Sequence, residues 1–279
     1  MQLLRFRRLM KLEHSCPVLP VAAVGLALCV LFVGCTTVPV TGRKALNTVS
    51  DEAVVQMSKQ EFQAIKQRSR VSRDPAKIAR VERVAQRIAD VVFWDMPNAD
   101  WEFVVFESPG EVNAFAMAGG KVGVFSGALD VATTDDELAV ILAHEIAHVT
   151  ARHVHELLSQ QMLVEGGGIG LAVATGYGSL TQAAVSTLYS LGSGMIGLNF
   201  NRAKESEADY IGLIYMARAG FDPRAAISLW EKIDRLGSGK SVPPEWLSTH
   251  PSHEDRLLKL YGWMAEAEEI YRKSKVASS

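Results

Sequence analysis

The feature that most constrains this chain is a pair of histidines four residues apart, His144 and His148, with Glu145 directly after the first. Residues four apart lie on the same face of a helix, so both imidazoles can reach one ion. A catalytic zinc takes three protein ligands and keeps one position open for water. The sequence therefore predicts one Zn²⁺ per chain, bound by His144 and His148, with Glu145 as the general base that activates the water.

The helix that carries this motif has a well-marked beginning. Thr134 is followed three residues later by Glu137, which is the pattern of a capping box. The histidines outside the first 34 residues also fall into only two groups, 144–155 and 250–253. Both observations favour a metal site over a chance occurrence of the motif.

A third ligand is expected among the acidic residues of a predicted helix over 202–219. Glu205 and Asp209 are four residues apart and share a face of this helix, whereas Glu207 points away from Asp209. If one acid binds the metal and another orients a ligating imidazole, the two are Glu205 and Asp209. We predict that Glu205 is the ligand and Asp209 the supporting residue, with Glu207 a solvated charge. The alternative is that all three acids are surface residues.

His250 precedes Pro251, which restricts it to extended backbone conformations and places it on a loop that can reach a distant site. Three roles are open. His250 could be a fourth ligand that displaces water and keeps the site latent, or a hydrogen-bond donor to the oxyanion, beside Arg256. It could also be a surface residue that caps the next helix.

The remaining histidines are not expected to bind metal. His155 lies on the predicted helix face of His148, two turns and about 10 Å further on, and His153 faces elsewhere. Both are predicted to be surface or supporting residues, and His253 is predicted to decorate the last helix.

Residues 1–34 differ from the rest of the chain. Basic residues near the start precede an apolar run over 18–34 that ends in Gly34 and Cys35. This pattern is typical of a secretory signal and resembles a bacterial lipobox, in which Cys35 would be acylated and become the new N-terminus. An uncleaved membrane anchor is the alternative. All three cysteines lie at or before the cut, so no disulfide is expected in the mature chain.

The rest of the chain predicts an α+β fold that is mostly helical. Helices are expected over 49–68, 75–92, 202–219, 223–236 and 252–273, besides the motif helix. Strands are expected over 101–106 and as a hairpin of 113–117 and 121–125. Residues 36–47 are polar and predict a tether over 35–48. One domain is expected to follow over 49–279. Segment 165–198, rich in glycine and apolar residues, is predicted to be a packed helical hairpin or to touch a membrane. The net charge of −2 and the lack of a basic stripe exclude a nucleic-acid binder.

The motif at 144–148 followed by Glu205 and Asp209 resembles the gluzincin metallopeptidases, in particular the family of HtpX, the CAAX prenyl proteases and the Oma-type proteases. Residues 35–43 are similar to the mature start of its periplasmic BepA- and LoiP-like lipoprotein members, and 249–252 with Arg256 resemble a loop that faces the zinc. The several membrane spans of HtpX and the prenyl proteases have no counterpart here, so their membrane chemistry is not carried over. The segment that resembles the family's active-site edge strand consists of Asn113, Ala114, Phe115 and Ala116.

The resemblance implies a zinc endopeptidase that cleaves misfolded or misassembled envelope proteins. Substrates would add an extended strand to the sheet edge beside the zinc. Because no aspartate follows Cys35, the expected location is the periplasmic face of the outer membrane. The lipid would be the anchor, and the outer-membrane assembly machinery is expected as a further partner. The rival hypothesis is a chaperone-like assembly factor for outer-membrane proteins with a latent metal site. Glu145 argues against it, because a structural metal needs no general base.

Overall fold

The computed structural model describes residues 35–161, 200–237, 250 and 255–277. The chain divides into two units, Met1–Gly34 and Cys35–Ser279, and all the described residues belong to the second. The predicted signal peptide, segment 165–198 and His253 lie outside the described residues. The fold is therefore that of the second unit.

A three-stranded sheet is built from β3 (Glu102–Phe106), β4 (Ala114–Met117) and β5 (Lys121–Phe125). β5 is central, parallel to β3 and antiparallel to β4. The predicted hairpin is confirmed, and Gly119 and Gly120 at its turn both have positive φ, which glycine adopts without steric cost. β4 is consequently an edge strand of this sheet.

Helices make up most of the described structure. The helices predicted over 49–68 and 75–92 are confirmed and begin at Asp51, capped by Ser50, and at Pro75, capped by Asp74; the capping box of Thr134 and Glu137 is confirmed as well. The α+β class expected from the sequence is therefore confirmed. The helices are α2 (Asp51–Arg68), α3 (Pro75–Val91), α4 (Ser126–Val131), α5 (Asp135–Thr150), α8 (Arg202–Arg218), α9 (Ala225–Gly237) and α11 (Arg256–Ala277).

Helix α5 is the centre of the fold. It packs against α8, α3, α9 and the edge strand β4, and every residue from Glu137 to His148 is buried. A helix that is apolar on all sides is typical of such a position. Polar side chains in this stretch are therefore held inside the protein.

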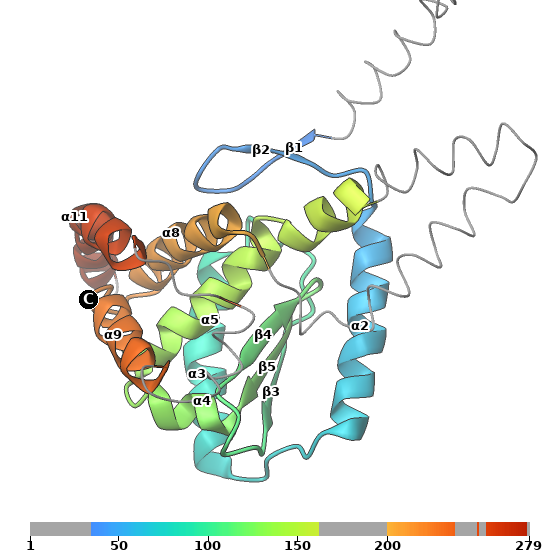
Figure 1. Cartoon of the computed structure of the whole chain (residues 1–279), viewed down its shortest axis with the longest axis horizontal. Coiled ribbons are helices and arrows are strands. Elements are labelled where there is room, and N and C mark those ends of the chain that lie inside the picture. The colour runs from blue at the N-terminus through green and yellow to red at the C-terminus, as the bar shows by residue number, and fades with distance from the viewer. Residues whose placement is uncertain (1–34, 162–199, 238–249, 251–254, 278–279) are drawn as a thin grey trace, which may run out of the picture. The chain divides into compact units, whose positions relative to one another are not determined.

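The sheet lies between two layers of helices (Figure 1), with α2 on one side and α3 and α5 on the other. On the α2 side, Phe62 and Ile65 pack against a group of phenylalanines from all three strands. On the other side, strand residues such as Ala114 and Val122 join the main core, which also contains side chains of α3, α5 and α8. The main core thus fixes α5 and α8 against the sheet.

The segment predicted as a tether differs from that expectation. It forms a second, two-stranded sheet in which β1 (Cys35–Thr37) pairs antiparallel with β2 (Lys44–Leu46). The reason is that Val38 and Ala45 are apolar and only 1% exposed, as part of the main core. The hairpin is therefore packed onto the domain, despite its polar composition.

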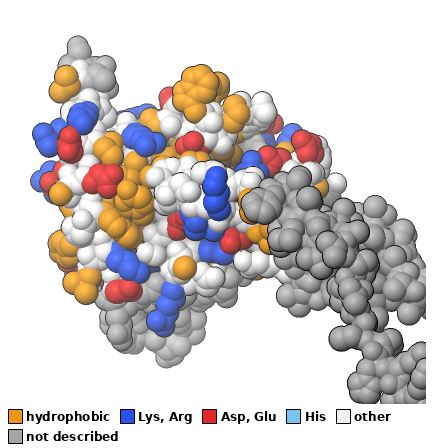
Figure 2. All heavy atoms as spheres, turned by 90° about the horizontal axis from the view of Figure 1, so that it is seen from above, with side chains coloured by type: hydrophobic (Ala, Val, Ile, Leu, Met, Phe, Trp, Pro, Cys, Tyr) orange, Lys and Arg blue, Asp and Glu red, His pale blue; other side chains and the backbone are white. Residues whose placement is uncertain are grey.

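The surface of the domain is mixed in character. On the face drawn in Figure 2, basic and acidic side chains are interspersed with hydrophobic ones. Within the described ranges, none of the helices combines the length and hydropathy needed to span a bilayer.

Candidate metal centre

His144 and His148 lie on consecutive turns of α5, and both are buried. Their rings are 4.8 Å apart between centroids, and the two Nε2 atoms are 3.1 Å apart. The i, i+4 spacing thus brings both imidazoles to one point, as the sequence predicts. Phe200 stacks on His148 at 4.5 Å and fixes the plane of its ring.

Helix α8 crosses α5 closely at Gly212. A Cβ there would lie 3.0 Å from the backbone nitrogen of His144, so only glycine allows this approach without a shift of the helices. The contact brings the first turns of α8 against the two histidines. Glu205 is fully buried there, and its oxygens lie 3.5 Å from Nε2 of His144 and of His148.

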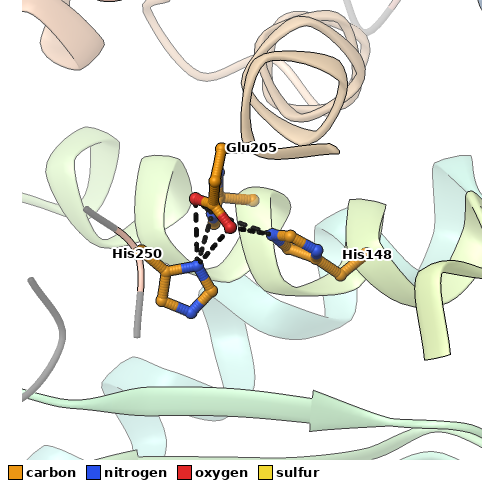
Figure 3. A group of neighbouring side chains, drawn as sticks. His148, Glu205 and His250 are labelled. Atoms are coloured by element: carbon orange, nitrogen blue, oxygen red, sulfur yellow. Dashed lines mark hydrogen bonds and ion pairs between the residues drawn. The ribbon is translucent and has the colours of Figure 1, made fainter. Parts of the chain in front are cut away.

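His250 completes a cluster of four possible ligands. Its Nδ1 lies 3.1 Å from both oxygens of Glu205 and 3.3 Å from Nε2 of His144. Figure 3 shows His250 and His148 on either side of the Glu205 carboxylate. One ligand atom from each of His144, His148, Glu205 and His250 lies within 4.8 Å of the others. The structure therefore brings together residues from α5, α8 and the stretch before α11.

Glu145 and Asp209 flank this cluster. An oxygen of Glu145 is 3.5 Å from Nε2 of His250, so the carboxylate borders the cluster without being part of it. Asp209 lies on the other side, with Oδ1 3.0 Å from Nδ1 of His144. Asp209 thus stands behind His144, where the sequence analysis expects a supporting residue.

Arg256 holds the two acids of α8 in place. Its guanidinium donates to Asp209 Oδ2 at 2.6 Å and to Glu205 Oε2 at 3.1 Å, and it stacks over Trp230 at 3.6 Å. Arg256 is the first residue of α11, and its side chain is directed onto these carboxylates. The buried acids are therefore charge-compensated.

The cluster has the electrostatics of a cation site. Burial lowers the pKa of His144, but Asp209 and Glu205 outweigh it and raise the pKa to about 10. Burial raises the pKa of Glu205, but its hydrogen bonds with His144 and His250 lower it overall. The negative charge that would hold a proton on this ring equally favours a bound cation.

A sequence model of Peptidase family M48 matches residues 75–264, which include all four residues of the cluster. The chain belongs to peptidase family M48. The mitochondrial metalloendopeptidase OMA1 of Saccharomyces cerevisiae is 34% identical over 212 residues, covering 71% of this chain and 59% of the relative. The beta-barrel assembly-enhancing protease of Escherichia coli K12 is 32% identical over 228 residues, covering 79% and 46%. Human OMA1, also named a mitochondrial metalloendopeptidase, is 30% identical over 233 residues, covering 78% and 44%.

This M48 chain spans between 44% and 59% of the length of these relatives. The predicted resemblance to Oma-type metallopeptidases is confirmed, and the cofactor of the family is zinc. The donor set fits that ion, because zinc takes imidazole nitrogens and carboxylate oxygens. The Nδ1 atoms of both histidines on α5 have partners on the outer side, which leaves each Nε2 directed at the cluster.

Two further residues lie directly behind His148, namely His153, which the sequence analysis leaves as a surface or supporting residue, and Glu207. His153 is fully buried, with Nδ1 2.8 Å from Nδ1 of His148 and Nε2 3.1 Å from Glu207. The prediction that Glu207 is a solvated charge is wrong, since its side chain is only 9% exposed and also accepts hydrogen bonds from Arg43 and Thr41. Burial raises the pKa of Glu207, but the hydrogen bonds from His153 and Arg43 lower it to about 2.

His155 also differs from its predicted position. Helix α5 ends at Thr150, and Arg152 has a positive φ of 59°, so the helical stretch over 153–161 is not a continuation of α5. His155 is buried, and its Nε2 lies 3.2 Å from Asp51 of α2. It is therefore neither a surface residue nor in contact with the cluster.

Proposed function

We propose that this chain is a zinc endopeptidase that cleaves misfolded or misassembled proteins of the bacterial envelope. The observation that carries the proposal is the buried cluster of His144, His148 and Glu205, with Glu145 at its border. Bound zinc would supply a Lewis acid that lowers the pKa of a water and polarises the scissile carbonyl. His144, His148 and Glu205 would hold it, and Asp209 would fix the ring of His144.

Glu145 is the general base in this proposal. Its carboxylate takes a proton from the attacking water, whose oxygen bonds to the carbonyl carbon. The same carboxylate then gives the proton to the amine nitrogen as the C–N bond breaks. Glu145 is buried, with only 4% of its surface exposed, and it borders the cluster, which supports this role.

The substrate is proposed to bind along Asn113, Ala114, Phe115 and Ala116. Supporting this, β4 is the edge strand of its sheet and packs against α5, which carries the motif. Phe115 packs among the phenylalanines on the α2 side, which anchors the strand. An extended peptide could add to the edge through main-chain hydrogen bonds, which suits unfolded clients of varied sequence.

His250 is proposed as a fourth ligand that keeps the site latent. The position of its Nδ1 supports this role, because Nδ1 lies 3.1 Å from Glu205 and 3.3 Å from Nε2 of His144. The 3.5 Å approach of its Nε2 to Glu145 would also occupy the general base. Activation would then require His250 to move away.

The envelope location rests on the first 35 residues. We propose that 1–34 is a signal peptide of the lipoprotein type and that Cys35 is acylated and holds the chain at the periplasmic face of the outer membrane. Cys35 is exposed at the start of the folded unit, which leaves it accessible for modification. The relationship to a protein named beta-barrel assembly-enhancing protease supports a role near outer-membrane assembly. The similarity of residues 35–43 to the mature start of LoiP-like lipoproteins is part of the same proposal.

Casein cleavage tests the activity and separates it from the chaperone alternative. The mature wild-type chain and the His250→Ala variant are assayed with and without a chelator. Glu145→Gln is introduced into each of these two backgrounds. We expect cleavage that His250→Ala increases, that the chelator abolishes and that Glu145→Gln lowers by about 10²–10⁴-fold with zinc retained. Absence of cleavage in both backgrounds, with zinc bound, would favour the assembly factor. A wild-type rate in Glu145→Gln would refute its role as the base.

A further inference from the structure

The two histidines of the motif are supported in different ways at their outer nitrogens. Nδ1 of His144 meets a carboxylate directly, at 3.0 Å from Asp209. Nδ1 of His148 meets another imidazole, at 2.8 Å from Nδ1 of His153. A second imidazole thus takes the place that a carboxylate or a backbone carbonyl commonly fills behind a metal-binding histidine.

Only one set of tautomers satisfies these contacts when Nε2 of His148 is a ligand. A ligating Nε2 carries no proton, so Nδ1 of His148 must carry it and donate to His153. Nδ1 of His153 is then the acceptor, and its proton lies on Nε2. That nitrogen is 3.1 Å from Oε2 of Glu207, which accepts the hydrogen bond. The carboxylate of Glu207 therefore selects the tautomer that turns Nε2 of His148 toward the cluster.

Glu207 is held in turn by the N-terminal hairpin. Nε of Arg43 donates to both oxygens of Glu207, at 2.9 and 2.8 Å, and Thr41 donates at 2.8 Å. The other end of the guanidinium donates to Glu156 at 3.0 Å, and Lys204 pairs with the same Glu156 at 3.1 Å. Arg43 therefore links the hairpin, α8 and the helical stretch over 153–161.

We propose that His153, Glu207 and Arg43 form a positioning network for His148, through which the hairpin after Cys35 sets the affinity of the metal centre. The proposal rests on His148 being a zinc ligand. His153 supplies the acceptor, Glu207 fixes its tautomer, and Arg43 fixes Glu207. None of the three touches substrate or metal, so their effect is on the orientation and basicity of one ligand.

Zinc affinity of the full chain, purified in detergent, is the test. It is measured by competition with a chromogenic chelator after removal of the metal, and the visible spectrum of the Co²⁺-substituted protein reports the ligand field. His153→Ala should weaken zinc binding by about 10–100-fold and change the Co²⁺ spectrum. His153→Asn places an amide oxygen near the position of Nδ1 and should recover affinity to within about threefold of wild type.

Charge variants extend the test along the network. Glu207→Gln and Arg43→Gln should each weaken zinc binding by roughly 3–10-fold, since they act at greater distance from the ligand. Arg43→Lys should fall between Arg43→Gln and wild type, because an ammonium keeps the charge but not the paired geometry. The matched control is Arg83→Gln on α3. It breaks the ion pair of Arg83 with Asp135 of α5 and should leave the zinc affinity unchanged.

The outcomes separate this proposal from the ligand assignment. If His148→Ala leaves zinc binding intact, the ligand assignment itself fails. If His148→Ala abolishes binding while the folded His153→Ala, Glu207→Gln and Arg43→Gln variants bind zinc like wild type, the positioning network is refuted. Should His153→Ala not fold, Glu207→Gln decides, because it preserves the shape of the side chain and replaces one of its two acceptor oxygens with a donor. A loss of melting temperature without a loss of zinc affinity also counts against the proposal.

Discussion

His144 and His148 lie one turn apart on the same helix, but the structure supports them by different means. The Asp209–Arg256 pair behind His144 is buried, and the carboxylate touches the imidazole directly. The network behind His148 reaches its carboxylate only through His153, and it ends in Arg43, whose side chain is 35% exposed. Direct support should therefore be strong and insensitive to the solvent, and relayed support weaker and adjustable from the surface.

The sharpest contrast is expected from removal of Asp209. Asp209→Ala leaves Nδ1 of His144 without its acceptor and leaves buried Arg256 with one carboxylate fewer. Zinc affinity should fall by about 10–100-fold. The free energy of unfolding of the metal-free protein should fall by about 3 kcal/mol, because breaking a buried ion pair is costly even though Glu205 still contacts Arg256.

Chelator competition and urea unfolding measure the two effects. Asp135→Ala, at the start of α5, is the control: it removes partly exposed pairs with Arg80 and Arg83 and should cost about 1 kcal/mol or less. If Asp209→Ala weakened zinc binding no more than Arg43→Gln does, direct and relayed support would be equivalent, and the comparison would fail.

The sequence predicts the direct support and misses the relayed one for a physical reason. Glu205 and Asp209 are recognisable because helical periodicity places them on one face of α8. The same periodicity directs Glu207 away from them, and on an isolated helix that direction means solvent. Here it means the far side of α8, which the hairpin and the stretch over 153–161 cover. Such cover comes from contacts between residues more than 100 positions apart, such as Arg43 and Glu156.

Local signals likewise explain which elements could be predicted. Thr134 and Glu137 mark the start of α5 because a capping box is a contact within one turn. The end of α5 carries no such signal: Arg152 adopts a positive φ, which arginine seldom does. Periodicity therefore continues the helix too far and misplaces His155. The composition of residues 36–47 indicates a tether because few of them are apolar, and only Val38 and Ala45 of the hairpin are buried.

His155 offers a test of how the stretch that carries His153 is attached to α2. Burial and the charge of Arg152 lower the pKa of His155 from 6.5 to about 4. The folded protein therefore keeps His155 neutral, while the unfolded chain takes up a proton below pH 6.5. The contribution of His155 to the free energy of unfolding should be fully present above that pH. It should be lost as the pH drops toward 4, a loss on the order of 2–3 kcal/mol.

The measurement compares wild type with His155→Gln, which cannot take up the proton. The difference in unfolding free energy between the two, followed by urea denaturation from pH 7.5 to 4, should shift in favour of His155→Gln as the pH falls. A constant difference across this range would show that the folded protein takes up this proton at the same pH as the unfolded chain, so that the ring is charged below about pH 6.5. The contact with Asp51 would then be an ion pair.

Gly212→Ala tests the close approach that makes direct support possible. Alanine favours helix by about 1 kcal/mol over glycine, but its Cβ would lie 3.0 Å from the backbone of His144. We expect a net loss of about 1–2 kcal/mol in unfolding free energy, because α8 must move away from α5. Zinc affinity should fall as well, since Glu205 and Asp209 move with α8. A stabilised variant with unchanged zinc affinity would show that the helices can separate freely.

The smallest expected effect concerns salt. Arg43 is partly exposed, so dissolved ions can screen its attraction to Glu207, whereas the buried Arg256 is shielded from them. The loss of zinc affinity in Arg43→Gln relative to wild type should shrink from about fivefold at 0.1 M NaCl to about twofold at 1 M, a change below about 1 kcal/mol. The loss in Asp209→Ala should stay the same at both concentrations. Equal salt dependence in the two variants would mean that solvent reaches both supports alike, and the distinction between a buried pair and a surface-linked network would have to be abandoned.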